Sequence, residues 1–184
     1  MRHQTSLMSS LSEKIVGAIA DVPDFPKAGV IYKDITPIFQ DSDLCKEILE
    51  EMKSTFSSSG AEAVLGMESR GFLFGLPLAM ALNVPFILVR KKGKLPRESY
   101  AVSYALEYGE ATIEMHKDAL RPGQKVLIHD DVLATGGTAC AAAELVGMAN
   151  AEVIGFSFLS ELTFLNGREN LKKYSEHIST FVSY

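Results

Sequence analysis

Residues 126–139, VLIHDDVLATGGTA, constrain the fold of this chain more than any other stretch. An apolar run passes into two adjacent aspartates, Asp130 and Asp131, and a run of small residues then leads into a helical pattern. Two neighbouring carboxylates are costly to bury, so they are expected at a strand end that opens onto solvent or a ligand. The stretch therefore predicts a strand, a tight turn and a helix in succession.

The same alternation of strand and helix continues along most of the chain. Ser10 and Glu13 form a capping-box pattern at the start of a first helix, and turn residues over 21–37 predict a loop. Apolar strands that alternate with helices indicate an α/β fold, whose parallel sheet is covered on both faces and binds ligands at the carboxyl ends of its strands. Strands are predicted over 61–67, 85–90, 111–116, 125–129 and 151–159, and further helices over 41–56, 71–83 and 138–149.

Composition argues against several classes of protein. A chain of 184 residues suits one compact domain, and its net charge of −5 gives no sign of a nucleic-acid-binding surface. No apolar run approaches the ~20 residues that a membrane-spanning helix needs. Residues 1–10 lack the apolar core of a signal peptide and are expected to be a frayed start. Cys45 and Cys140 form no disulfide framework, so a reducing, cytoplasmic location is expected, without nucleic-acid or membrane partners.

The small residues after the aspartates suit an anion. Between a strand and a helix, the backbone N–H groups of residues 134–138 can converge on a phosphate, and Thr135 and Thr138 can add hydroxyl donors. No lysine follows the second glycine, so the stretch is not a P-loop. Asp130 and Asp131 suit vicinal hydroxyls, because a carboxylate accepts two hydrogen bonds. A phosphate beside a diol indicates ribose 5-phosphate, and the alternative is a glycine-rich turn with two solvated acids.

Residues 126–139 resemble the phosphoribosyl-pyrophosphate (PRPP) signature of the type I phosphoribosyltransferase family. Five further segments, FPKAGVIYKDITPIF, ESRGFLFG, VRKKGKLP, SYALEYG and SELTFLNGRE, are similar in order and spacing to the members of that family that use adenine. The resemblance implies transfer of the 5-phosphoribosyl group of PRPP to adenine, which gives AMP and pyrophosphate in purine salvage and uses Mg²⁺.

The resemblance also implies the organisation of the chain. The type I phosphoribosyltransferase fold has a central parallel sheet, here expected to have five parallel strands, flanked by helices. One phosphoribosyltransferase domain is implied over 1–184, with a small hood to which residues 25–40 contribute and a flexible active-site loop over 95–113. Assembly as a homodimer is implied as well.

Roles toward PRPP follow from the resemblance. Clustered cations would stabilise the negative charge of a leaving pyrophosphate. The alternative for Arg70 and for the cationic run that includes Lys92 is a solvated surface. A cis peptide is implied between Glu68 and Ser69, and Arg90 is implied to reach across a dimer interface. The implied contacts are Ala134, Thr135, Gly136, Gly137 and Thr138 for the 5-phosphate, Asp130 and Asp131 for the ribose, and Ser69, Arg70, Lys91, Lys94 and Arg90 for pyrophosphate.

Catalysis and base recognition are assigned in the same way. Glu107 and Tyr108 lie in the implied active-site loop, and Glu107 is the candidate that moves a proton at adenine N7 as N9 attacks. Tyr32 stands where the family commonly has Phe, and Lys33 where Arg is common. The alternatives are a surface position for Glu107 and core packing for the apolar candidates. Adenine is implied to bind Ile31, Tyr32, Lys33 and Leu162, with Tyr32 stacked on the base and main-chain contacts from Ile31 and Lys33.

Ala134 bears on which base is used. Relatives that act on hypoxanthine and guanine resemble one another in placing an aspartate at this point, so an alanine favours adenine, while cytokinin-type bases stay open. His129 is expected to be packed and without a role, and His3, His116 and His177 show no metal-ligand spacing. No dedicated protein metal site is therefore expected, and Mg²⁺ is implied to be carried mainly by PRPP.

Two other functions remain open. One is a regulator that keeps the PRPP-binding fold as a sensor without catalysis. Such a protein needs an effector domain or a basic surface, and the intact SYALEYG segment, Lys91 and Lys94 argue against it. The other is a transferase for a different base, against which Ala134 argues in the case of the 6-oxopurines.

Overall fold

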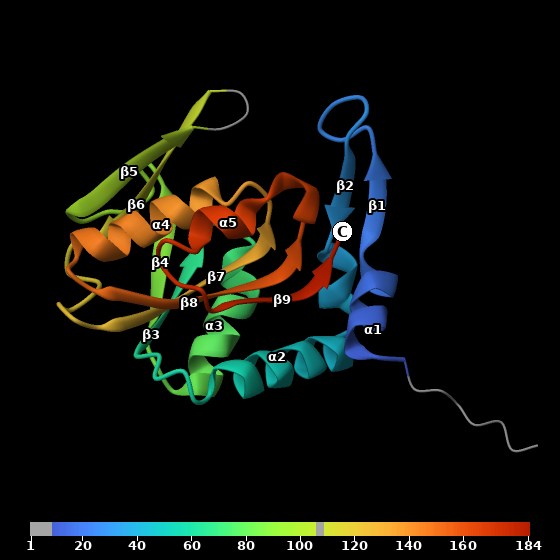
Figure 1. Cartoon of the computed structure of the whole chain (residues 1–184), viewed down its shortest axis with the longest axis horizontal. Coiled ribbons are helices and arrows are strands. Elements are labelled where there is room, and N and C mark those ends of the chain that lie inside the picture. The colour runs from blue at the N-terminus through green and yellow to red at the C-terminus, as the bar shows by residue number, and fades with distance from the viewer. Residues whose placement is uncertain (1–8, 106–108) are drawn as a thin grey trace, which may run out of the picture. The chain divides into compact units, whose positions relative to one another are not determined.

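The structure is a computed structural model that describes residues 9–105 and 109–184 (Figure 1). The chain divides into two compact units, Met1–Glu50 and Glu51–Tyr184. The first holds α1 (Leu11–Ala18), β1 (Ala20–Pro23), β2 (Ile31–Asp34), the 3₁₀ helix η1 (Thr36–Gln40) and most of α2 (Ser42–Phe56). The second holds β3 (Ala63–Met67), α3 (Gly71–Leu82), β4 (Phe86–Lys91), β5 (Ser99–Ala105), β6 (Glu110–His116), β7 (Lys125–Leu133), α4 (Gly137–Met148), β8 (Glu152–Glu161), the 3₁₀ helix η2 (Thr163–Leu165), α5 (Gly167–Leu171) and β9 (Ile178–Ser183).

The first unit is built on a capped helix and a hairpin. The predicted capping box is confirmed: the Ser10 hydroxyl accepts a hydrogen bond from the Glu13 N–H, and the Glu13 carboxylate accepts one from the Ser10 N–H. The prediction of a loop over 21–37 is wrong in part, because β1 and β2 pair as antiparallel strands there. Each strand has only four residues, too few for a clear alternation of apolar and polar positions, so the turn residues between them dominated the pattern.

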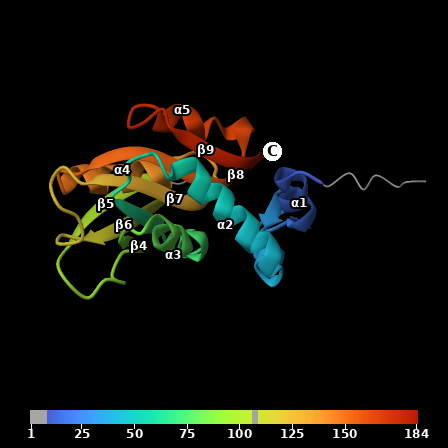
Figure 2. The ribbon, with the colours of Figure 1, turned by 90° about the horizontal axis from the view of Figure 1, so that it is seen from below.

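The second unit contains a seven-stranded sheet in the order β5-β6-β4-β3-β7-β8-β9. Strands β4, β3, β7, β8 and β9 are parallel, which confirms the predicted number of five. Their membership differs from the prediction, because the strand predicted over 111–116 is β6, which joins β5 in an antiparallel hairpin at the β4 edge, and β9 was not predicted. Helix α3 covers one face of this sheet, and α4 and α5 cover the other (Figures 1 and 2). The α/β class and the helices on both faces are therefore confirmed.

Small residues let both layers approach the centre of the sheet closely. On one face, the buried alanines of α4 pack on a core that includes Leu65, Val89 and Ile128. On the other, a Cβ on Gly71 at the start of α3 would lie 2.8 Å from Oδ1 of Asp130. The amino end of α3 is thus held against the carboxyl end of β7, which is where the sequence predicts a ligand. None of the helices in the described ranges combines the length and apolar character needed to cross a membrane.

Strand β7 is longer than predicted, because its two neighbours end at different points. On the β3 side, pairing ends with Gly66 opposite His129, whereas on the β8 side it continues to Leu133 opposite Glu161. Asp130 therefore lies just beyond the pairing of β7 with β3, but within the pairing of β7 with β8. His129 is buried, as the sequence predicts, and lies 3.3 Å from the Ser157 hydroxyl. Burial lowers its pKa to about 4.

Candidate active site

A pocket of about 240 Å³ opens at the carboxyl ends of β3 and β7. It brings together the residues predicted for the 5-phosphate, the ribose and part of the pyrophosphate. Such a position, outside the strand ends of a parallel sheet, is the usual ligand site of α/β folds. The lining residues are Glu68, Ser69 and Arg70 after β3, Tyr104 on β5, Asp130 to Ala139 on β7, the following turn and α4, and Phe158 on β8.

The turn over 134–138, called here the phosphate cradle, leads into the amino end of α4. Gly136 is the residue before the helix and has φ +80°, a left-handed conformation that suits glycine. No side chain caps this helix end, so its first N–H groups face the pocket without a side-chain acceptor. The Thr138 hydroxyl donates a hydrogen bond of 3.0 Å to the Tyr104 hydroxyl on β5, a contact that the sequence did not indicate. An uncapped helix end of this kind attracts anions.

The two carboxylates differ in their surroundings. Oδ2 of the buried Asp131 lies 3.1 Å from Nε of Arg70, but within residues 9–105 and 109–184 that oxygen accepts no hydrogen bond. Oδ1 of Asp130 accepts a hydrogen bond from the Asp131 N–H. Burial raises the pKa of both groups; the charge of Asp131 adds to the effect on Asp130, while Arg70 opposes it on Asp131. Both carboxyls therefore favour a ligand that brings hydrogen-bond donors.

Glu68 organises the cationic side of the pocket. Its Oε2 accepts a hydrogen bond of 2.9 Å from the Lys91 N–H and lies 3.3 Å from Nε of Arg90. These contacts, led by the Lys91 N–H, lower the pKa of Glu68. Arg90 also donates to the Lys94 carbonyl oxygen, and its reach across a dimer interface stays a prediction. The Glu68–Ser69 peptide is cis, as the resemblance implies.

A second cavity of about 500 Å³ shares Glu68, Tyr104 and Thr138 with the first. Lys91 and Lys92 line it, and both are exposed, so their charges are available to an anion. Lys94 is exposed, and neither it nor Arg90 lines either cavity. Their roles toward pyrophosphate stay predictions.

The structure leaves the residues predicted for adenine in separate units. On β2, Ile31 is 61% exposed, the Tyr32 ring meets the Phe25 ring edge-on, and Nζ of Lys33 lies 2.6 Å from an Asp21 oxygen. In the second unit the Leu162 N–H donates to the Leu133 carbonyl oxygen, which joins it to the end of β7. A common adenine pocket for these residues stays a prediction.

Glu107 and Tyr108 lie outside the described residues. The strands that flank them are described: β5 and β6 form a hairpin in which Ala105 is the partner of Glu110. Much of the segment 95–113 is thus strand, and its movement stays a prediction. Among the residues described, no three His, Cys, Asp or Glu side chains gather as a metal site, and both cysteines are free thiols.

Sequence reasoning missed Glu68, Tyr104 and Phe158 as lining residues. Glu68 carried a usable signal, because it follows a buried strand directly, just as Asp130 follows the apolar part of β7. Tyr104 and Phe158 carried none, since their approach to the cradle depends on how β5 and β8 pair.

Comparisons with known proteins agree with this geometry. A model of the phosphoribosyl transferase domain matches residues 32–178. An adenine phosphoribosyltransferase of Cytophaga hutchinsonii is 48% identical over 174 residues, which cover 95% of this chain and 96% of that protein. The crystal structure of adenine phosphoribosyltransferase from Rhodothermus marinus has a TM-score of 0.88 at 48% identity, covering 95% of this chain and 98% of the other. The Saccharomyces cerevisiae enzyme, complexed with an imino-altritol bisphosphate and adenine, has a TM-score of 0.85 at 38% identity and covers 93% and 98%.

Proposed function

The chain belongs to the adenine phosphoribosyltransferases of the phosphoribosyl transferase domain family, and we propose that the pocket at the ends of β3 and β7 is where it binds PRPP. The reaction joins N9 of adenine to C1 of the ribose, breaks the bond from C1 to pyrophosphate, and releases the N9 proton. Its products are AMP and pyrophosphate. The observation that carries the proposal is one pocket that holds an uncapped helix end beside two carboxylates, because PRPP presents a phosphate beside a diol.

Each part of PRPP has a complementary group. The 5-phosphate binds the N–H groups of the phosphate cradle and the Thr135 and Thr138 hydroxyls, aided by the dipole of α4. The ribose hydroxyls donate to Asp130 and Asp131, which supplies the hydrogen bond that Oδ2 of Asp131 lacks. As the bond to pyrophosphate breaks, positive charge develops on the ribose, and the same carboxylates stabilise it.

Pyrophosphate leaves toward the cations. Arg70 lines the pocket at the Ser69 turn, and Lys91 lines the adjoining cavity. Arg90 and Lys94 complete the cluster, and Glu68 holds the Lys91 N–H and the Arg90 guanidinium in place. Charge on the leaving group grows in the transition state, so fixed cations accelerate its departure.

Tyr32 stacks on adenine, Ile31 and Lys33 supply main-chain contacts to it, and Leu162 supplies an apolar contact. Glu107 takes part in proton transfer on the ring, and Tyr108 lies beside it in a loop that closes over the site and excludes water. Mg²⁺ carried by PRPP fits this pocket, because Asp130 and Asp131 offer it acidic oxygens. When bound, the ion neutralises part of the pyrophosphate charge. A reducing cytoplasm is the proposed location, because both cysteines are free thiols.

The proposed homodimer has a candidate surface on α3. Leu73, Leu76 and Met80, called here the α3 stripe, are 48%, 48% and 72% exposed and recur at helical spacing. A contiguous apolar stripe of this kind is typical of an interface. We expect the Leu76→Glu, Met80→Glu variant to sediment as a monomer at micromolar concentration, where the unmodified protein sediments as a dimer. The control is Met148→Glu, which changes an exposed methionine on α4. A dimeric stripe variant would place the interface elsewhere, and a monomeric unmodified protein would end the dimer proposal.

The function is tested by AMP formation from adenine and PRPP with Mg²⁺, beside hypoxanthine, guanine and isopentenyl-adenine. Turnover of adenine far above the 6-oxopurines is expected, because Ala134 stands where their transferases carry an aspartate. Turnover of hypoxanthine or guanine at the same rate would refute the argument from Ala134. PRPP binding without turnover of any base would favour the sensor instead.

A further inference from the structure

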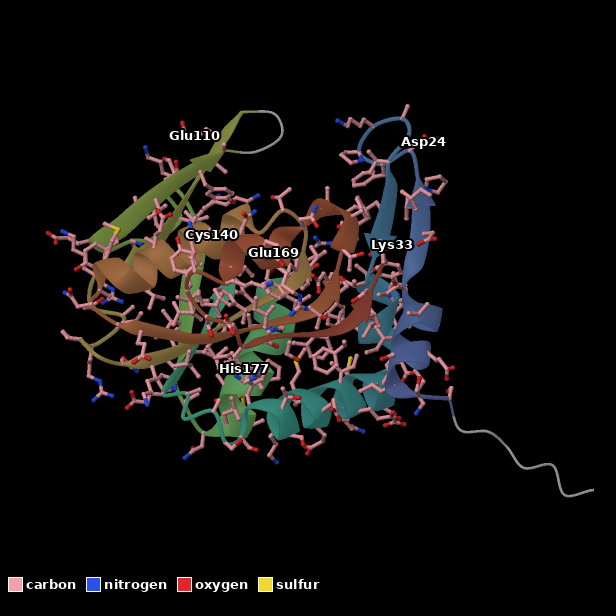
Figure 3. The ribbon with its side chains drawn as sticks, viewed as in Figure 1. Asp24, Lys33, Glu110, Cys140, Glu169 and His177 are labelled. Carbon is pink, nitrogen blue, oxygen red and sulfur yellow. The ribbon has the colours of Figure 1, made fainter. Side chains whose placement is uncertain are left out.

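We propose that residues 162–171, called here the cradle support, fix the conformation of the phosphate cradle, and that Asn170 is its positioning residue. The cradle support follows β8 and contains η2 and α5, which lies beside α4 on the same face of the sheet; Glu169 on α5 and Cys140 on α4 are labelled in Figure 3. The inference rests on the proposed function, because it concerns the group that binds the 5-phosphate.

Hydrogen bonds join the cradle support to both sides of the cradle. Just before the cradle, the Leu162 N–H donates to the Leu133 carbonyl oxygen at 2.9 Å. In the middle of it, Nδ2 of Asn170 donates to the Thr135 carbonyl oxygen, also at 2.9 Å. Just after it, the Cys140 thiol donates to the Asn170 carbonyl oxygen at 3.4 Å. The cradle support is therefore hydrogen-bonded to the chain before the cradle, within it at Thr135, and after it.

The two backbones also touch where each carries a glycine. A Cβ on Gly167 would lie 2.1 Å from the Ala134 carbonyl oxygen and 3.0 Å from the Gly136 nitrogen. A Cβ on Gly136 would lie 2.8 Å from the Gly167 carbonyl oxygen. Side chains cannot approach so closely, so glycine is required on both sides of the contact. The position of Gly167 thus sets where the cradle backbone can run.

The cradle support is itself anchored to the sheet. Nη2 of Arg168 lies 2.5 Å from Oε2 of the buried Glu161 at the end of β8, and Nη1 donates to the Ile178 carbonyl oxygen on β9 at 2.8 Å. Leu171 is fully buried in the core under α4. A segment held in this way keeps the cradle in one conformation before a phosphate binds, so less conformational entropy is lost on binding.

Peptide geometry explains what the cradle support does. In a trans peptide the C=O and the following N–H point in opposite directions. The Ala134 and Thr135 carbonyl oxygens face Gly167 and Asn170, so the N–H groups of Thr135 and Gly136 point away from the cradle support. Thr135 and Gly136 line the pocket, and the N–H groups are thereby turned toward the anion.

The Asn170 side chain is the part of the cradle support that can be replaced without disturbing the core. It is exposed, and its side-chain amide supplies one neutral hydrogen bond to the cradle. We therefore expect Asn170→Leu, which keeps the size and removes the donor, to weaken binding of ribose 5-phosphate and AMP by about 3- to 10-fold. The KM for PRPP should rise by a similar factor, while the KM for adenine and the dissociation constant of pyrophosphate stay unchanged.

The experiment is titration calorimetry of ribose 5-phosphate, AMP and pyrophosphate with the full chain. Lys172→Leu is the matched control, because Lys172 is exposed at the end of the same helix and pairs only with Glu169 among the described residues. Asn170→Gln keeps an amide donor and should recover part of the lost affinity. Melting temperatures of all variants should agree, since no core residue is changed.

Two results would overturn the inference. One is equal affinity for ribose 5-phosphate in Asn170→Leu and the unmodified protein. The other is an equal loss for pyrophosphate, which would show a general disturbance of the site instead of an effect on the cradle. Failure of the unmodified protein to bind ribose 5-phosphate at all would instead count against the proposed function, so the two failures are distinguishable.

Discussion

Replacement of Glu107 by glutamine is expected to lower kcat by about 10²- to 10⁴-fold, the usual contribution of a positioned proton-transfer group. Neutral adenine must lose its N9 proton as N9 attacks, and a carboxylate can exchange protons with the ring where an amide cannot. Affinity for PRPP should change little, because the carboxylates and the cradle that are proposed to bind it are untouched. Steady-state rates with each substrate varied in turn, together with calorimetry of PRPP, measure both quantities.

Glu110→Gln is the matched control for this variant. Glu110 is an exposed glutamate at the start of β6, three positions along the chain, so its replacement makes the same change of charge in the same hairpin. We expect it to keep the unmodified kcat. If turnover of the Glu107→Gln variant is also unchanged, Glu107 has no part in the mechanism, and a rise in the KM for PRPP at constant kcat would make it a binding residue instead.

The residues that could be predicted from the sequence are those whose signal is local. Asp130, Asp131 and the cradle stand next to each other in the chain, and the buried strand before them already indicates a ligand at its end. Four of the parallel strands, β3, β4, β7 and β8, were equally readable, because continuous apolar runs are typical of a sheet covered on both faces. Ser10 and Glu13 were found for the same reason, since a capping box spans only four positions.

The features that escaped prediction depend on pairing between distant segments. Gly167 and Asn170 lie more than thirty positions along the chain from the cradle residues that they contact. No local sequence pattern indicates that either residue contacts the cradle. Strand β9 has no strong alternation of apolar and polar residues. It forms because its backbone pairs with the free edge of β8. Strand β5 was missed as well, although its partner β6 was predicted over 111–116, because the residues before it are mainly turn and charged residues and it forms by pairing with β6.

Asp130 is expected to destabilise the free protein while it strengthens PRPP binding. Burial and the neighbouring charge of Asp131 raise its folded-state pKa well above the ordinary 3.8. The folded protein therefore binds this proton more tightly than the unfolded chain, and the resulting stability is present below pH 3.8 and lost as the pH rises through the raised pKa. An ionised Asp130 carboxyl thus opposes folding, and under the proposed function it is kept because ribose hydroxyls donate to it.

Asp130→Asn should accordingly have a higher Tm than the unmodified protein at pH 8, with a gap that narrows as the pH falls toward 4. For a chain of this size, each kcal/mol of relief corresponds to about 2–4 °C. Its affinity for PRPP should fall by about 10-fold, because a hydrogen bond to a charged acceptor is worth more than one to a neutral amide. Melting curves from pH 4 to 8 and PRPP calorimetry test both halves, with Asp131→Asn as a second test of PRPP affinity.

Asp118→Asn is the control for the loss of one negative charge, since Asp118 is 65% exposed and pairs with Arg97 on the surface. It should change neither PRPP affinity nor the pH dependence of Tm, because an exposed pair contributes little. If neither Asp130→Asn nor Asp131→Asn alters the KM for PRPP or kcat, the carboxylates do not hold the ribose. If Asp130→Asn gains stability and keeps its affinity for PRPP, the carboxylate destabilises the fold and has no part in binding. If the variant loses both stability and affinity, the Asp130 carboxylate stabilises the end of β7 itself. Only the combination of a higher Tm and weaker PRPP binding fits a carboxylate kept for its ligand at the expense of stability.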